Sequence, residues 1–135
     1  NLTPTEYDSM KQHPIIGAKI IDPIGLPKTV SEIILQHHEW YNGSGYPNGI
    51  DHSKIHPLTS IVAVADSFDA MTSKRNYRDK LDYVDAVQEV LRHKGVQFDP
   101  LVAEALFNCQ MQVFQALKTP KMIRDLLTQD LSYGA

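Results

Sequence analysis

Three histidines stand at positions from which they could bind metal ions. His37 and His38 are adjacent near the end of an expected helix. His13 directly precedes Pro14, and we expect the first helix to bend just after His13. Imidazole nitrogens are common ligands of transition-metal ions. Because neighbouring side chains on a helix diverge by about 100°, we expect the pair to offer one imidazole to each of two neighbouring ions.

One carboxylate, Asp66, follows the apolar run Ile61–Ala65 inside another expected helix. A bare carboxylate is costly to bury, so Asp66 is expected to be paired, hydrogen-bonded or metal-bound. The structural alternative is a buried cap or an ion pair with Arg75 or Arg78.

The histidines also have plain structural interpretations. His13 can be a half-buried polar residue, and the His37–His38 pair can complement the dipole at the end of its helix. The remaining histidines stand beside loop residues, where we expect them to be solvated: His52, His56 and His93.

Helix signals surround these residues. Thr3-Pro4-Thr5-Glu6 has the residues of a capping box and opens a helix that Pro23 ends near Asp22. A second helix is expected from about Thr29 to His38. The stretch from 41 to 49 holds three glycines, two asparagines and a proline, a composition typical of a loop.

Further helices follow this loop. The residues from Leu58 to about Thr72 predict a buried helix, and Asp82 opens another that runs to Arg92 before Gly95. Asp99-Pro100 and Thr119-Pro120 repeat a cap followed by proline, which predicts helices to about Leu117 and Leu131. Six helices and no credible sheet predict an all-α fold.

The composition sets limits on function. The chain has 135 residues, 42% of them hydrophobic, which suits one domain, and its net charge of −3 argues against binding a nucleic-acid polymer. No apolar run approaches the roughly 20 residues of a membrane span. A lone cysteine, Cys109, excludes an intrachain disulfide and fits the reducing cytoplasm. The chain begins with Asn1 rather than Met, so we expect a piece of a longer protein.

The stretch from His37-His38-Glu39 through Gly45-Tyr46-Pro47 to Gly49 resembles the signature loop of HD-GYP domains, bacterial phosphodiesterases that hydrolyse cyclic di-GMP. The flanking segments agree in order and spacing: Leu2–Gly17, Ile61–Arg78 and Gly95–Pro100. The resemblance covers about residues 2–106 and implies an HD-domain-like helical bundle. The whole chain, 1–135, would then be a partial HD-GYP domain with C-terminal helices over about 100–131.

The resemblance implies a role for each matching residue. Four match metal ligands of the family: His13, His37, His38 and Asp66. Gly45, Tyr46 and Pro47 match the loop that shapes the substrate side, where glycines would let a bulky ligand approach and Tyr46 could stack on guanine. Arg75 and Arg78 match positions near the nucleotide and could hold its phosphates. The implied cofactors are two or three divalent ions, Fe or Mn.

One family feature is absent, because no histidine in this sequence is followed by aspartate. The His-Asp doublet of the family lies upstream of the segment resembling Leu2–Gly17, so we expect the N-terminal helices of the domain to be missing. Residues 1–135 alone should then bind metal poorly, show negligible hydrolysis and expose apolar surface that favours a homodimer. The implied partners are cyclic di-GMP and GGDEF-type or other signalling proteins.

Two other functions stay open. The chain could be a degenerate, non-catalytic module that binds a nucleotide or a protein through the glycine loop and the arm carrying Arg75 and Arg78. It could also belong to an HD-type phosphohydrolase of other nucleotides, but the Gly45-Tyr46-Pro47 loop counts against this.

Overall fold

The structure is a computed structural model that describes residues 3–73 and 81–117. Within these residues it contains no β-strand, and the all-α expectation is confirmed. The predicted helix up to Leu131 lies outside the described residues. The observed helices are α1 (Pro4–Met10), α2 (His13–Ile21), the 3₁₀-helix η1 (Asp22–Ile24), α3 (Lys28–Gln36), α4 (Pro57–Thr72), α5 (Tyr83–Arg92) and α6 (Pro100–Leu117).

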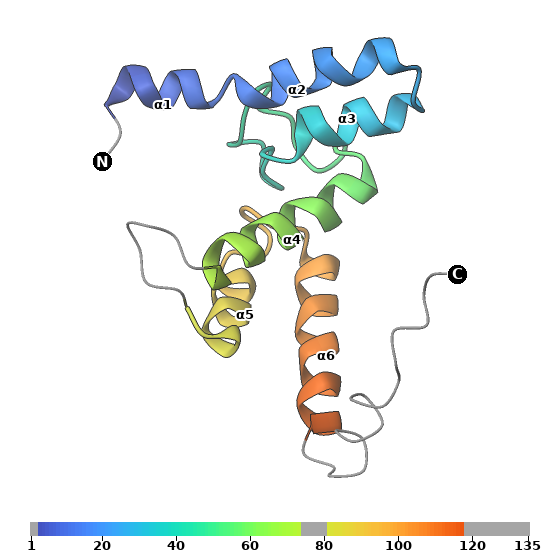
Figure 1. Cartoon of the computed structure of the whole chain (residues 1–135). Coiled ribbons are helices and arrows are strands. Elements are labelled where there is room, and N and C mark those ends of the chain that lie inside the picture. Colours follow the sequence, from blue (N-terminus) through green and yellow to red (C-terminus); the bar gives the residue numbers. More distant parts are fainter. Residues whose placement is uncertain (1–2, 74–80, 118–135) are drawn as a thin grey trace.

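The helices are arranged on either side of α4. Figure 1 shows α2 and α3 side by side as an antiparallel pair, with α4 crossing below them. On the other side, α4 contacts α5 and α6, which also contact each other. Helix α4 therefore connects the pair that carries the histidines to the rest of the fold. Among the described helices, none has both the length and the apolar character needed to cross a membrane.

Polar caps begin three of the helices where the sequence predicts them. Thr3 and Glu6 form a reciprocal capping box at α1. The side chain of Asp82 accepts a hydrogen bond from the backbone N–H of Asp85 at 2.9 Å, and Asp99 accepts one from the residue two positions later at 2.8 Å. These caps satisfy N–H groups that have no partner inside the helix.

The first predicted helix is in fact two helices. We expected a bend just after His13, but α1 ends at Met10 and α2 begins at His13. Pro14 occupies the first turn of α2, where its missing N–H costs no helical hydrogen bond. The proline therefore starts a helix instead of bending one.

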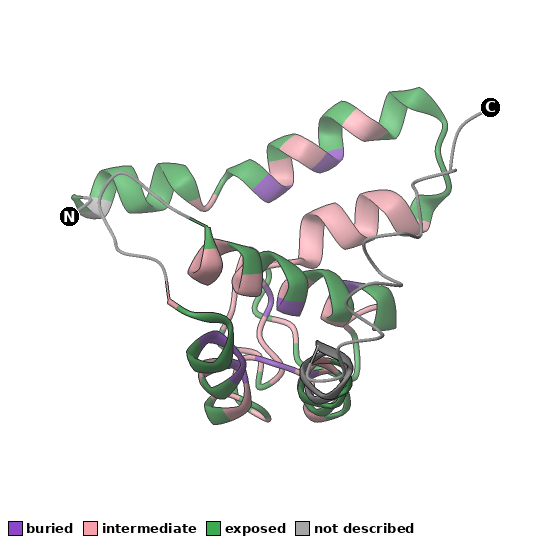
Figure 2. Cartoon of the chain, turned by 60° about the horizontal axis from the view of Figure 1, so that its bottom comes forward, coloured by how far each residue is buried: buried purple, intermediate pink, exposed green. Residues whose placement is uncertain are grey.

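The prediction of a buried helix is wrong for most of α4. Only Thr59 and Val64 are buried in it, whereas Ile61 is 53% exposed. The reason is that the described helices that contact α4, namely α3, α5 and α6, leave much of its surface uncovered. Figure 2 shows how little of the chain is fully buried. The buried core consists of Val64, Val90, Phe98 and Ala103.

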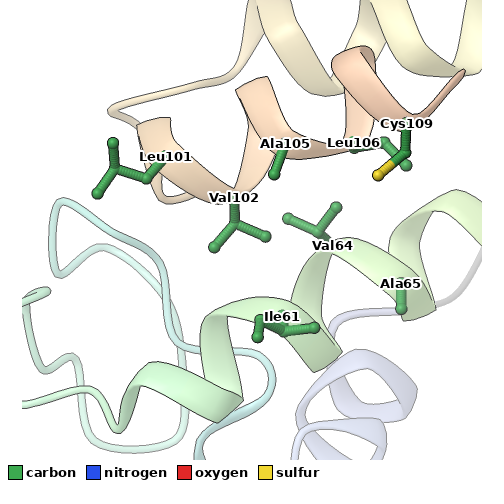
Figure 3. A pocket seen from close by; sticks show the side chains of 8 residues that line it. All are labelled: Ile61, Val64, Ala65, Leu101, Val102, Ala105, Leu106 and Cys109. Carbon is green, nitrogen blue, oxygen red and sulfur yellow. The ribbon is translucent and has the colours of Figure 1, made fainter. Parts of the chain in front are cut away.

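An apolar groove of about 390 Å³ lies between α4 and α6. Figure 3 shows Ile61, Val64 and Ala65 of α4 on one side and Leu101 and Val102 of α6 among the side chains on the other. Leu101 is 78% exposed. The expected exposure of apolar surface is thus present, and the homodimer stays a prediction.

Candidate metal centre

The three sequence-predicted histidines meet at one point. His13 is the first residue of α2, while His37 caps the end of α3 and His38 follows it. The Nε2 atom of His13 lies 3.3 Å from Nε2 of His37 and 3.1 Å from Nε2 of His38. Ligand atoms of all three lie within 4.8 Å of one another. The antiparallel packing of α2 against α3 brings these distant residues together.

Two of these rings are oriented by the backbone. The Nδ1 atom of His13 lies 2.7 Å from the carbonyl oxygen of Met10, and Nδ1 of His37 lies 2.7 Å from that of Ile34. A carbonyl oxygen can only accept, so each Nδ1 carries the proton and donates it. The Nε2 lone pairs then point into the cluster, as in metal-binding imidazoles.

The expectation that His37 and His38 diverge is wrong. It assumed that both lie on a regular helix, but α3 ends at Gln36 and both histidines lie in the turn after it. Their ring centroids are 4.1 Å apart. Adjacent nitrogen donors of an octahedral ion lie about 3 Å apart when each metal–nitrogen distance is about 2.1 Å. The observed separations of 3.1 and 3.3 Å therefore fit one divalent ion.

The cluster opens into a cavity of about 480 Å³, which Asp66 of α4 also lines. The Asp66 carboxylate lies outside the group of ligand atoms that are all within 4.8 Å of one another. Its side chain is exposed, so the expected burial is wrong, and water can solvate the charge without a partner. Arg75 and Arg78, the alternative ion-pair partners, lie outside the described residues.

Electrostatics keep two groups of the cavity uncharged. Burial lowers the pKa of His38 to about 4, and the charges of His37 and His13 act in the same direction against the opposing effect of Asp66. Burial also raises the pKa of Tyr46 to about 12. At neutral pH, His38 is thus an uncharged imidazole, which is the form that can bind a metal ion, and the hydroxyl of Tyr46 keeps its proton.

Of the predicted loop residues Gly45, Tyr46 and Pro47, only Tyr46 lines this cavity. Its backbone N–H donates to the carbonyl oxygen of His38 at 3.1 Å, and its ring lies 4.8 Å from that of His38 between centroids. The hydroxyl donates to Sδ of Met10 at 3.7 Å. One face of the Tyr46 ring is therefore covered by His38, and stacking of Tyr46 on guanine stays a prediction.

Gly45 allows a close approach of the protein's own backbone, and its expected role toward a ligand stays a prediction. A Cβ atom at this position would lie 2.3 Å from the backbone nitrogen of Trp40 and 2.4 Å from the carbonyl oxygen of His38. Such distances exclude any side chain. The loop consequently folds back tightly onto the residues that follow the histidine pair.

Glu39 has a structural role that the sequence reasoning missed. Its side chain is only 3% exposed, and its carboxylate accepts hydrogen bonds from the backbone N–H groups of Asn48 at 2.6 Å and Ile50 at 3.1 Å. It thereby ties the far end of the glycine loop to the histidine pair. The sequence did contain a signal for this role. Glu39 is a charged residue directly after two candidate ligands and shortly before a loop that needs hydrogen-bond acceptors.

Two of the remaining histidines also differ from expectation. His56 is half-buried and accepts a hydrogen bond from the backbone N–H of Leu58 at the start of α4. His93 is half-buried, and its Nδ1 lies 3.0 Å from the carbonyl oxygen of Glu89. His52 is exposed as expected, and its ring stacks on Tyr41.

Comparisons with known proteins show the family of the chain. A family model described as HD domain matches residues 1–102. The chain is 38% identical over 122 residues to a cyclic di-GMP phosphodiesterase of Thermotoga maritima, and covers 33% of that protein with 89% of its own length. It is 35% identical over 103 residues to a 3′3′-cGAMP-specific phosphodiesterase of Vibrio cholerae, and covers 20% of that protein with 75% of its own length.

A solved structure described as an HDG"Y"P protein from Bdellovibrio bacteriovorus superposes with a TM-score of 0.67 at 26% identity, covering 82% of this chain and 35% of that one.

The chain belongs to the HD domain family. Within that family it is an HD-GYP domain, as its signature loop indicates. It spans about a third of the length of the first of these relatives. HD-domain phosphohydrolases are metal-dependent, and the three histidines form a group that could hold an ion.

Proposed function

We propose that the complete protein hydrolyses cyclic di-GMP to linear pGpG or GMP, and that this chain supplies one metal-binding wall of its active site. The convergence of the His13, His37 and His38 Nε2 atoms at the edge of a cavity carries this proposal. The names of the two phosphodiesterase relatives support the choice of a cyclic dinucleotide as the substrate.

The three histidines would hold a divalent ion, and Asp66, which lines the same cavity, would add a carboxylate ligand to the metal centre. Nitrogen and oxygen ligands suit Fe or Mn. When bound, such an ion supplies Lewis-acid stabilisation of the phosphoryl oxygens and an activated water. Two or three ions would need ligands beyond these four, since each takes about six.

The remaining residues would bind and orient the substrate. The protonated hydroxyl of Tyr46 can donate a hydrogen bond to a phosphate oxygen at the mouth of the cavity. Arg75 and Arg78 would bind phosphates through pairs of N–H hydrogen bonds. GGDEF-type signalling partners, a homodimer and a cytoplasmic location complete the proposal. The partners rest on the resemblance of the motifs, the homodimer on the exposed apolar surface, and the location on the lone cysteine.

Hydrolysis by the complete protein tests the proposal. Cyclic di-GMP and 3′3′-cGAMP are incubated with the wild type, with His37→Ala and with a His52→Ala control, and products are separated by chromatography. His52 is exposed and stacks on Tyr41, and it does not line the cavity of the three histidines. We expect His37→Ala to lower turnover about 100-fold or more, and His52→Ala to leave it within twofold. Wild-type turnover in His37→Ala would refute the proposal.

A further inference from the structure

A second cavity adjoins the one that holds the histidines. It has a volume of about 310 Å³ and lies between α4, α5 and the turn before α6. Ser67, Ala70 and Gln97 line both cavities. These shared residues place the second cavity directly beside the one that holds the histidines.

The second cavity combines apolar walls with a few polar groups. Met71 and Phe98 provide the apolar surface, while Glu89 and His93 of the α5 end supply a carboxylate and an imidazole. A concave site with this mixture is typical of small-molecule binding. Apolar side chains can pack against the faces of a planar aromatic ring, and polar groups can contact its edge.

Two neighbouring side chains hold the Glu89 carboxylate in place. It forms an ion pair with Arg92, and one of its oxygens lies 3.5 Å from Nδ1 of His93. An ionised carboxylate has about four acceptor sites on its two oxygens, so these contacts leave acceptor capacity unused.

We infer that this second cavity is a guanine subsite in which Glu89 reads the edge of the base. Guanine presents its ring N–H and its exocyclic amine side by side, and one carboxylate can accept from both. Adenine presents an amine beside a ring nitrogen that carries a lone pair, and this lone pair would repel the carboxylate oxygen. The Gln97 carboxamide, with one acceptor and two donors, can bond the base or its ribose. The inference rests on the proposed function, because it assumes a nucleotide with its phosphate at the histidines.

Nucleotide titration of the 135-residue chain tests this subsite without catalysis. GMP and AMP are added separately to isotope-labelled chain in EDTA, and backbone amide signals are followed by NMR. Both probes carry the same phosphate, so their difference reports on the base. We expect GMP to shift the amides of Ser67 and Gln97 and to bind at least fivefold more tightly than AMP. Equal affinity for the two nucleotides would overturn the inference.

Variants assign the preference to Glu89. Glu89→Gln should reduce the preference for GMP to less than twofold, while Glu104→Gln should retain it. Glu104 is exposed, bonds Lys94 at 2.9 Å and lines neither cavity. A preference that survives Glu89→Gln would refute the role of this residue. If Glu89→Gln does not fold, Gln97→Leu carries the test, because it should lower GMP affinity at least threefold, and an unchanged affinity would overturn the subsite.

The outcome separates this subsite from the proposed function. A GMP preference in the presence of EDTA supports the subsite even if the complete protein hydrolyses no cyclic dinucleotide. The complete protein is also compared on cyclic di-GMP and cyclic di-AMP. Hydrolysis with a preference that Glu89→Gln leaves unchanged would overturn the subsite and leave the proposed function standing.

Discussion

The Nε2 atoms of His13 and His38 lie 3.1 Å apart, although 25 positions separate the two residues in the chain. Two ring nitrogens at this separation attract each other only when a proton or a cation lies between them. The donor on His13 is already used, since its Nδ1 proton goes to the carbonyl oxygen of Met10. In the metal-free chain a neutral His38 that carries its hydrogen on Nε2 supplies the donor to Nε2 of His13, and a bound cation would take the place of that hydrogen.

The metal-free chain should keep His38 neutral down to about pH 4. Because this pKa lies below the unfolded value of 6.5, the unfolded chain takes up the proton first. The contribution of His38 to stability is therefore complete above pH 6.5 and is lost as the pH falls toward 4. An NMR titration in EDTA, with the ring signals assigned from a His38→Gln spectrum, measures the pKa. A midpoint near 6.5 would contradict the burial of this ring.

Glu39→Gln should destabilise the glycine loop. The replacement keeps the shape but removes the charge that accepts from the Asn48 and Ile50 N–H groups. We expect a loss of about 2 kcal/mol in the free energy of unfolding, measured with urea. Glu104→Gln, at an exposed ion pair with Lys94, should cost less than about 1 kcal/mol. Equal effects of the two changes would contradict the anchoring role of Glu39.

Gly45→Ala should cost more than Gly25→Ala. The added methyl group at position 45 would overlap backbone atoms of Trp40 and His38, which cannot move aside as a flexible side chain can. At Gly25 the space is open, but the positive φ of 77° is unfavourable for alanine. We expect about 3 kcal/mol for Gly45→Ala and about 1 kcal/mol for Gly25→Ala from urea unfolding. A reversed order would show that the loop can rearrange.

Much of the fold follows from local sequence signals. The caps at Thr3, Asp82 and Asp99 begin helices as predicted, because a cap depends only on residues within one turn. The choice of His13, His37 and His38 as a group also agrees with the structure. That choice rested on the resemblance to HD-GYP domains, since no single spacing among these histidines indicates a metal site.

The errors concern properties that depend on distant contacts. To predict the direction of the His38 side chain, one must know that α3 ends at Gln36, two residues earlier than we expected. The exposure of Asp66 depends on which elements cover α4, and an apolar run cannot show this. Glu39 was missed because its partners, nine and eleven positions later, become visible only when the loop is closed.

Residues 1–135 alone should show negligible hydrolysis of cyclic di-GMP. Three imidazoles and one carboxylate cannot fill the coordination of two divalent ions, and no histidine in the sequence is followed by aspartate. The measurement is product formation by the purified chain in the presence of Mn or Fe. Turnover with stoichiometric bound metal would contradict this expectation.

Metal content tests the central claim most directly. The complete protein is purified as the wild type, as His38→Ala and as a His52→Ala control, and its bound Fe and Mn are counted by elemental analysis. If His13, His37 and His38 hold one ion together, His38→Ala should lose about one ion per chain and His52→Ala none. Full metal content in His38→Ala would contradict the account.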